Sequence, residues 1–333
     1  MTSKKKTVDT LKLLITDGCN LSCIYCVPEL QTKKLKKKGL KHGELLRLLR
    51  ALVSLGIENI DFRGGEPLTK KWLLPLLEET QRMPELKRIS LLTNGVVLKD
   101  YAVELRNLGL KEVGVHMDSL SFEKYMKITR GDHLDRVYAG LRAAEEAGFE
   151  RIKVYAMILK GLNSKEIIDF ALLTKEHAYE VVFLEYDPHD AGETRESRNN
   201  LRYPLRKIRD EIDNFQRLYP IKSPAIGEGE AFRFEDGFRV GEVDKGVIRF
   251  VNPLKNHRCD RCSRIVLTTD GLLGSCFLSD KTMDLRPLLD SKEGQEIAGV
   301  TDSVSKVLRN RPRKIPGQDK PFRLCSQFCF LDE

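Results

Sequence analysis

Short runs of apolar and β-branched residues alternate with longer amphipathic stretches between residues 11 and 188. This alternation is typical of repeated strand–helix units that form a parallel sheet covered by helices. The pattern predicts six strands, at Leu11–Thr16, Asn59–Arg63, Arg88–Leu92, Glu112–Met117, Arg151–Ile158 and Val181–Tyr186. It also predicts intervening helices, at Glu44–Leu55, Lys71–Arg82, Ala102–Leu108, Leu134–Ala147 and Lys165–Glu176. Six units favour an α/β fold with a partial (β/α)6 TIM-like barrel, smaller than the eight-unit form.

Five of the predicted strands end in clusters of glycine, acidic, amide or hydroxyl residues. The clusters are Asp17-Gly18-Cys19, Gly64-Gly65-Glu66-Pro67, Thr93-Asn94-Gly95, Asp118-Ser119 and Glu185-Tyr186-Asp187. The carboxyl ends of the strands form the active-site face of a parallel barrel. We therefore expect the five clusters to converge on one mouth.

The alternation of strand and helix patterns ends after residue 188. A polar stretch at 190–200 precedes a predicted helix at Tyr203–Leu218, and short strands with glycine turns begin near Glu228. A hairpin is expected over Arg264–Phe277, turning at Asp270-Gly271. The sequence thus predicts a barrel in residues 1–190, a linker and helix in 191–227, and a smaller α+β auxiliary domain in 228–333.

Composition narrows the class of protein. The formal net charge is +8, which favours an anionic small-molecule ligand but is spread too evenly to demand nucleic acid. No apolar run approaches the roughly 18 residues that cross a bilayer, and the first seven residues lack the apolar segment of a secretory signal. A cytoplasmic protein with no membrane partner is expected. In that reducing compartment, eight cysteines indicate metal ligation or redox chemistry rather than disulfides.

The first cysteine group, Cys19-x3-Cys23-x2-Cys26, directly follows the first predicted strand. A loop this short can place three thiolates around one iron–sulfur cube, leaving the fourth iron open for another ligand. A zinc knuckle is the alternative, but structural zinc takes four ligands and no nearby His or Cys supplies the fourth.

This loop resembles the signature of the radical S-adenosylmethionine (radical SAM) superfamily. The resemblance implies that Cys19, Cys23 and Cys26 are the catalytic cluster ligands and that reductive cleavage of SAM yields a 5′-deoxyadenosyl radical. It also implies that Tyr25 lies beside the adenine and that the GGEP motif at 64–67 contacts the SAM ammonium group. The implied SAM-binding residues are Tyr25, Gly64, Gly65, Glu66, Thr93, His116 and Asp187, although His116 and Asp187 stand where the family has Ser and Met.

The second cysteine group, Cys259-x2-Cys262-x13-Cys276, spans the predicted hairpin. Three thiolates again suit a second iron–sulfur cluster, while zinc is the alternative if Cys325 or Cys329 completes a four-thiolate site. If either of those two cysteines binds the cluster instead, its fourth iron is closed and the cluster would serve electron transfer. The last two cysteines, spaced i and i+4, could also be small apolar core residues.

The spacing and the segments LLTNG, MDSL, RIKVYAMILKGLN, FLEY and CSRIVLTTDGLLGSCF resemble the GTP 3′,8-cyclase family of molybdenum cofactor biosynthesis. That resemblance implies a lyase with two 4Fe-4S clusters that converts GTP to (8S)-3′,8-cyclo-7,8-dihydroguanosine 5′-triphosphate. It implies that the second cluster binds guanine, and that the substrate-binding residues include Lys12, Lys153 and Arg264. A reductant such as flavodoxin or ferredoxin is the expected partner, and a homodimer is left open.

The chain departs from this family at several positions. Lys12 and Asp61 stand where arginines are expected, as do Val182 and Val266, and Leu92 replaces a threonine. The C-terminal sequence CSQFCFLDE lacks the usual Gly-Gly pair. A second hypothesis is therefore a radical SAM enzyme with a twitch- or SPASM-like auxiliary domain that acts on another nucleotide, a sugar or a peptide. A non-enzymatic zinc- or nucleic-acid-binding protein is the third, but it explains neither the strand-end clusters nor GGEP.

Overall fold

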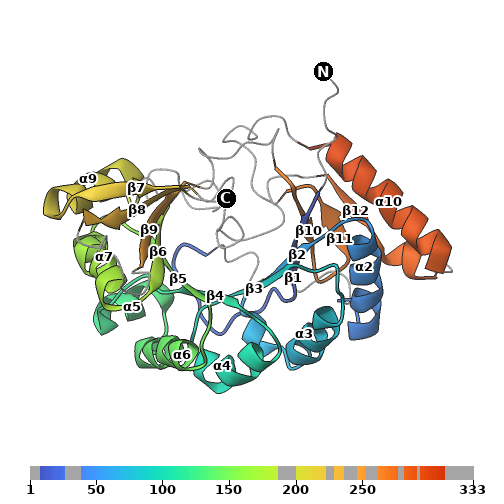
Figure 1. Ribbon diagram of the computed structural model, residues 1–333, viewed down its shortest axis with the longest axis horizontal. Coiled ribbons are helices and arrows are strands. Elements are labelled where there is room, and N and C mark those ends of the chain that lie inside the picture. The colour runs from blue at the N-terminus through green and yellow to red at the C-terminus, as the bar shows by residue number, and fades with distance from the viewer. Residues whose placement is uncertain are drawn as a thin grey trace.

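A computed structural model describes residues 8–26, 39–186, 200–222, 229–235, 246–252, 262–276, 281–290 and 293–311. Within these ranges the strands form one mixed sheet in the order β12-β11-β10-β1-β2-β3-β4-β5-β6-β9-β8-β7. Seven parallel pairings join eight strands from β10 to β9, and antiparallel strands extend both edges. The sheet curves into an open arc that does not close on itself (Figure 1).

Six strands form the centre of the arc and six lie toward its edges. The central strands are β1 (Thr10–Leu14), β2 (Asn59–Arg63), β3 (Arg88–Thr93), β4 (Glu112–His116), β5 (Arg151–Ile158) and β6 (Tyr179–Glu185). The remaining strands are β7 (Leu218–Ile221), β8 (Glu230–Phe234), β9 (Val247–Val251), β10 (Arg264–Leu267), β11 (Leu272–Gly274) and β12 (Thr282–Asp284).

Helices line the convex outer side of the arc, and its concave side faces the centre of the molecule (Figure 1). The α-helices are α2 (His42–Ser54), α3 (Leu73–Gln81), α4 (Leu98–Asn107), α5 (Phe122–Thr129), α6 (Leu134–Glu146), α7 (Ile167–Glu176), α9 (Leu205–Phe215) and α10 (Glu293–Arg309). Short 3-10 helices are η1 (Pro67–Thr69), η2 (Ser164–Glu166) and η5 (Arg286–Asp290). None of the helices in the described ranges has the length and apolarity to cross a membrane.

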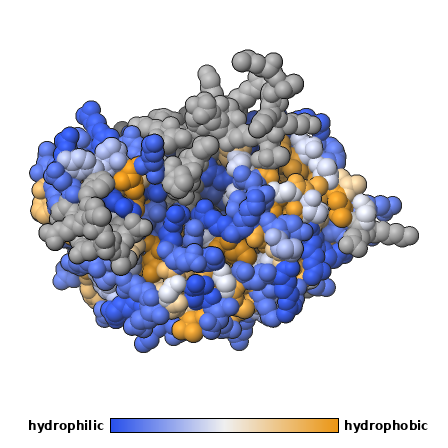
Figure 2. Space-filling view, viewed as in Figure 1, coloured by the Kyte–Doolittle hydropathy of each residue, from blue (hydrophilic) through white to orange (hydrophobic). Residues whose placement is uncertain are grey.

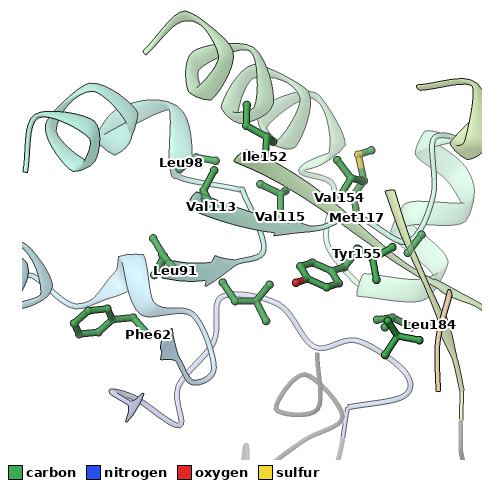
Figure 3. Close-up of a cluster of buried hydrophobic side chains, with 14 of the residues drawn as sticks. Phe62, Leu91, Leu98, Val113, Val115, Met117, Ile152, Val154, Tyr155 and Leu184 are labelled. Carbon is green, nitrogen blue, oxygen red and sulfur yellow. The ribbon is translucent and has the colours of Figure 1, made fainter. Parts of the chain in front are cut away.

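The apolar core fills the space between the sheet and the helices. Side chains alternate along each strand, so one set points toward the helices and the other into the concave side. Val113, Val115 and Val154 belong to the buried cluster in Figure 3, which the strands and the surrounding helices enclose. Hydrophilic residues dominate the outer rim of the face seen in Figure 2, with apolar residues visible between them.

The hydrophobic pattern predicted the central elements closely. All six predicted strands are present with ends within two residues, and the expected hairpin is confirmed because β10 and β11 pair antiparallel around residues 268–271. One helix begins earlier than expected, at Leu98, because Leu98 is buried on the same face as Ala102 and Leu105. The pattern missed α5 and α10.

Strands from the C-terminal part of the chain extend the barrel sheet at both edges. Strand β10 pairs with β1, and β9 pairs with β6, both in parallel register. The predicted fold class is a partial (β/α)6 barrel with a smaller C-terminal α+β domain, and the α/β partial barrel is confirmed; the described C-terminal strands continue the barrel sheet. The predicted domain limits at residues 190 and 227 stay predictions.

The aromatic packing behind β6 gives a test of the core. Phe183 is fully buried, stacks on Phe250 at a centroid distance of 5.8 Å and meets Phe170 edge-on at 6.4 Å. Replacing it by alanine should lower the free energy of unfolding by about 3–5 kcal/mol, because a cavity replaces the ring. Urea unfolding of the Phe183→Ala variant measures this loss. The exposed Val103→Ala variant is the control, and a shift there larger than about 0.5 kcal/mol would make the comparison invalid.

Candidate active site

The loop that carries the first three cysteines is held from below by a helix. It follows β1, and the backbone N–H groups of Ser22 and Ile24 donate to the carbonyls of Thr129 and Ile128 at 3.1 and 2.8 Å. These carbonyls end α5 and have no partner inside the helix. The loop thus satisfies the end of α5, and α5 fixes the path of the loop.

The loop after β2 packs its backbone directly on the cysteine loop. The amides of Gly65 and Glu66 donate to the carbonyls of Thr16 and Gly18 at 2.7 and 2.9 Å. A Cβ atom on Gly64 would lie 2.3 Å from the Thr16 oxygen, and one on Gly65 would lie 2.2 Å from the Gly18 oxygen. Both glycines are therefore required by the contact between the two loops, whatever ligand binds above them.

The carboxylate of Glu66 ties the end of β2 to the end of β3. It is fully buried and accepts hydrogen bonds from the Thr93 hydroxyl at 2.7 Å, the Asn94 amide at 2.7 Å and the Leu68 amide at 3.0 Å. Burial raises the pKa of Glu66 to about 7, although the three donors oppose that shift. The Thr93 side chain is thereby committed to Glu66.

A buried polar cluster lies beneath the cysteine loop at the ends of β4 and β5. The Tyr25 hydroxyl donates to Asp118, whose other oxygen accepts the Met157 amide at 2.8 Å. His116 Nδ1 lies 3.3 Å from the same carboxylate, and its ring centroid is 6.1 Å from that of Tyr25. Burial, followed by the charge of Asp118, raises the pKa of Tyr25 well above its ordinary value. Tyr25 therefore stays protonated as a donor.

Asn163 holds this cluster in place from the loop after β5. Its amide nitrogen donates to the carbonyls of Asp118 at 2.5 Å and Met157 at 2.8 Å, while its oxygen accepts the Leu159 amide at 2.6 Å. Sequence reasoning did not single out Asn163, which lies in the quoted segment RIKVYAMILKGLN. A fully buried amide with every partner satisfied is the property that marks it in the structure.

The surroundings of the sulfur atoms suit an iron–sulfur cluster. The Leu21 amide and the Asn94 side-chain amide donate to Cys19 Sγ at 3.4 and 3.6 Å. Donors of this kind stabilise a cluster-bound thiolate. Burial and the nearby Asp118 charge raise the pKa of Cys23, so its thiolate depends on bound metal for stability. In the residues that the structure describes, no group of three His, Cys, Asp or Glu side chains is gathered around a point as a single metal ion would require.

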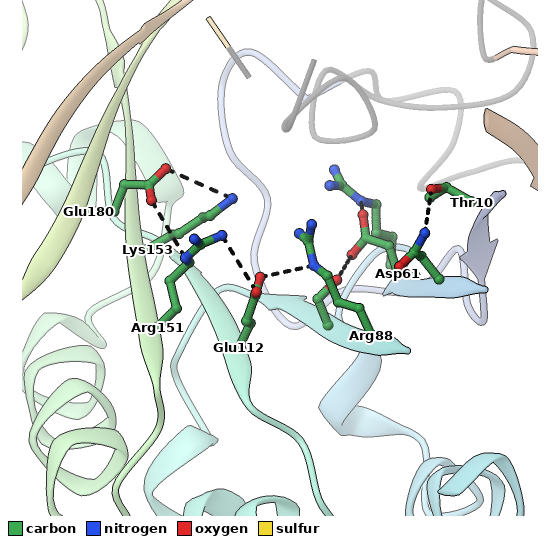
Figure 4. A network of polar contacts seen from close by, with 10 residues as sticks. Thr10, Asp61, Arg88, Glu112, Arg151, Lys153 and Glu180 are labelled. Atoms are coloured by element: carbon green, nitrogen blue, oxygen red, sulfur yellow. Dashed lines mark hydrogen bonds and ion pairs between the residues drawn. The ribbon is translucent and has the colours of Figure 1, made fainter. Parts of the chain in front are cut away.

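A chain of alternating charges runs along the concave side of the sheet (Figure 4). Glu180 forms its best connected point, because its carboxylate accepts Arg249 Nε at 2.6 Å and lies 3.9 Å from Lys153 Nζ. Asp61 pairs with the buried Arg63 and accepts the Ser90 hydroxyl at 3.1 Å. Further ion pairs connect Arg88, Glu112, Arg151 and Glu180 at 3.1–3.9 Å.

The proposed substrate residues lie on this charged concave side. Lys12 on β1 is 2% exposed and stands in register with both Asp61 and Val266, while Lys153 on β5 is 4% exposed. A pocket on the same side is lined by residues of β2 to β5 that include Asp61, Ser90 and Lys153. Charges this deeply buried are costly unless they are paired, so the alternation of signs is a condition of the fold.

The second cysteine group lies at the other edge of the barrel sheet. Cys262 precedes β10 by two residues and is buried, while Cys276 follows β11 by two residues and is half-buried. The antiparallel hairpin therefore brings these two segments to the same end. Asp187, Cys259, Cys325 and Cys329 lie outside the described residues.

Comparison with known proteins identifies the class of this enzyme. Residues 13–174 match the Radical SAM superfamily, and residues 179–316 match the family described as Molybdenum Cofactor Synthesis C. The chain is 34% identical over 321 residues to a GTP 3′,8-cyclase of Thermodesulfovibrio yellowstonii, covering 96% of each chain. It is 35% identical over 291 residues to a GTP 3′,8-cyclase of Geobacter sulfurreducens, covering 86% of each.

Solved structures support the fold alone. Streptococcus suis SuiB bound to S-adenosylmethionine superposes with a TM-score of 0.61 at 14% identity, covering 86% of this chain and 65% of SuiB. The structure of anSMEcpe with bound AdoMet gives a TM-score of 0.57 at 16% identity, covering 97% of this chain and 93% of that one.

The protein is a radical SAM enzyme. Within that superfamily, the chain belongs to the GTP 3′,8-cyclase family of molybdenum cofactor biosynthesis. Its cofactors are SAM and two 4Fe-4S clusters, the second associated with the C-terminal region. These findings confirm the predicted enzyme class, fold class and cofactors. The roles of the individual site residues stay predictions.

The buried Glu66 carboxyl gives a pH-dependent test. Its pKa is about 7 in the folded protein against 4.5 in the unfolded chain, so the folded state binds more protons between these values. Stability should therefore fall by up to about 3 kcal/mol as pH rises from 4.5 to 7.

Urea unfolding at a series of pH values measures this slope, and the Glu66→Gln variant should lack that part of it. The exposed Glu146→Gln variant is the matched control and should keep the wild-type profile. A Glu66→Gln profile parallel to the wild type between pH 4.5 and 7 would show that another group causes the slope.

Proposed function

We propose that this enzyme acts on GTP, converting it to (8S)-3′,8-cyclo-7,8-dihydroguanosine 5′-triphosphate. The observation that carries the proposal is the near full-length match to GTP 3′,8-cyclases, at 34% identity over 96% of both chains. The buried Lys and Arg side chains of the concave side support it, because guanidinium and ammonium groups pair well with phosphate oxygens.

The first cluster is assigned to Cys19, Cys23 and Cys26. When bound and reduced, it supplies the electron that splits SAM into methionine and the 5′-deoxyadenosyl radical. The chain's own contribution is to fix the loop between α5 and the Gly64-Gly65 backbone, so that the three sulfurs keep their relative positions. An ammonium group only donates hydrogen bonds, so it would donate to carbonyl oxygens of this loop and not contact the amides of Gly65 and Glu66, which donate to Thr16 and Gly18.

Residues beneath the cysteine loop are assigned to position SAM. Tyr25 and His116 both contact the Asp118 carboxylate, which also accepts the Met157 amide of β5, while Asn163 from the loop after β5 holds the backbone carbonyl of Asp118. Thr93 and Glu66 act through the backbone of their loops, since their polar atoms bond to one another. Asp187 keeps its assignment as a SAM-binding residue from the sequence alone.

Lys12, Lys153 and Arg264 are assigned to the substrate, and a neighbouring strand supplies one of the charges missing from the family pattern. Val182 stands where an arginine is expected, and its register partner on β9 is Arg249. Arg249 is 5% exposed, and Glu180 holds it together with Lys153 on the concave side. We infer that the Arg249 guanidinium lies close to the place that the side chain of an arginine at position 182 would occupy.

A small reductant of the flavodoxin or ferredoxin type is the proposed electron donor. Strong reduction is needed because SAM cleavage begins with transfer of an electron to the cluster. A homodimer stays a hypothesis.

The direct test is to incubate anaerobically reconstituted protein with SAM, GTP and dithionite. We expect about eight irons per chain, four for each cluster, with 5′-deoxyadenosine and a cyclised nucleotide detected by mass spectrometry. The Cys23→Ala variant should form neither product, because the first cluster loses a ligand. SAM cleavage that persists in this variant would contradict the ligand assignment. Release of 5′-deoxyadenosine by the wild type without cyclised product would point to another substrate.

The role of Arg249 is tested by moving the charge between strands. The Arg249→Val variant should weaken GTP binding by about 10- to 100-fold, as expected for loss of a charge-assisted hydrogen bond. The double variant Val182→Arg/Arg249→Val should recover most of that loss, because the two positions are in register. Calorimetric titration with GTP measures both, and Arg82→Gln, at the exposed end of α3 and outside this ion-pair network, is the control. Equal weakening in the single and double variants would show that Arg249 only supports the fold.

A further inference from the structure

Arg311 joins the two arms of the hairpin that carries the second cysteine group. It lies just beyond α10, and its Nη1 donates to the Cys262 carbonyl. Its Nη2 donates to the Arg264 carbonyl on the same arm and lies 3.4 Å from the Ser275 carbonyl on the other arm. One guanidinium therefore contacts the backbone of Cys262 itself and that of Ser275, the residue before Cys276.

Among the residues that the structure describes, two polar atoms beside these contacts are buried with no hydrogen-bond partner. They are Arg311 Nε and the hydroxyl of Ser275, a residue that is 1% exposed. A buried donor without an acceptor costs about 1–3 kcal/mol, and native proteins satisfy nearly all such groups. Two of them in one place indicate that an electron-rich acceptor belongs there.

The neighbouring cysteines indicate which acceptor these two donors would bind. Ser275 is the residue before Cys276, and Arg311 is bonded to the backbone of Cys262. Cluster sulfides and cysteine thiolates accept hydrogen bonds from N–H and O–H groups around iron–sulfur sites. Both donors and the thiols fit a second 4Fe-4S cluster.

We propose that Arg311 is a positioning residue for the second cluster, and that Arg311 Nε and the Ser275 hydroxyl donate to its sulfur atoms. The proposal rests on Cys262 and Cys276 as ligands and is independent of which substrate the enzyme uses. Hydrogen bonds and positive charge near the sulfurs stabilise the reduced cluster, because reduction adds negative charge. Loss of either donor should therefore lower the reduction potential.

The experiment isolates the second cluster by using the full chain in a Cys23→Ala background. Iron and sulfide per chain, the electron paramagnetic resonance spectrum and the midpoint potential are then measured after anaerobic reconstitution. Arg311→Gln should lose at least half of the remaining iron and shift the potential of the rest to a more negative value. Arg311→Lys should fall between, because it keeps the charge without the planar fork. Arg309→Gln, an exposed arginine two residues earlier, should match the background.

Ser275→Ala keeps the proposal testable if Arg311 variants fail to fold, because it removes one donor and leaves the clamp intact. It should retain the iron but show the negative shift in potential. Background values of iron, spectrum and potential in both Arg311→Gln and Ser275→Ala would overturn the proposal. A lower melting temperature of the iron-free Arg311→Gln protein, together with an unchanged midpoint potential of its second cluster, would also overturn it, because Arg311 would then only hold the hairpin together. A reconstituted Cys23→Ala protein that binds zinc or no metal would overturn it as well. GTP turnover is not measured, so the substrate assignment is tested separately.

Discussion

The site depends on backbone-to-backbone packing between two loops at neighbouring strand ends. The loop after β2 donates two amides to the loop after β1, at distances that leave no room for a side chain on either glycine. The buried Glu66 carboxylate extends this contact to β3, where Asn94 in turn reaches Cys19. The path of the cysteine loop is therefore set largely by main-chain contacts.

The concave side of the sheet follows a different rule from the core behind it. Toward the helices, apolar side chains fill space, and volume decides what is tolerated. Toward the centre, buried and partly buried cations and carboxylates alternate from β2 to β9, and Glu180 alone pairs with residues from two other strands. A substitution here changes a set of connected ion pairs rather than one contact.

The central strands could be predicted from the sequence because strand periodicity and length are local properties. The predicted and observed bounds agree, for example, at Asn59–Arg63 and Arg151–Ile158. The cysteine spacing and GGEP likewise located the loops at the mouth. The sequence could not show that Gly64 and Gly65 make room for backbone, that Tyr25 donates to Asp118, or that Arg249 stands beside Val182. Those relations depend on strand order and register. The helix α5 was missed because its eight residues bury only three side chains.

The pairing of β1 with β10 bears on how the chain is made by the ribosome. Thr10 is hydrogen-bonded in register with Arg264, so one side of the first strand stays open until some 250 residues have followed it out of the exit tunnel. At the other end of the barrel, the outer edge of β6 likewise stays unpaired until β9 has been made. Exposed strand edges invite association with other nascent chains. Both edges of the barrel sheet therefore stay open to other chains until β9 and β10 have been made.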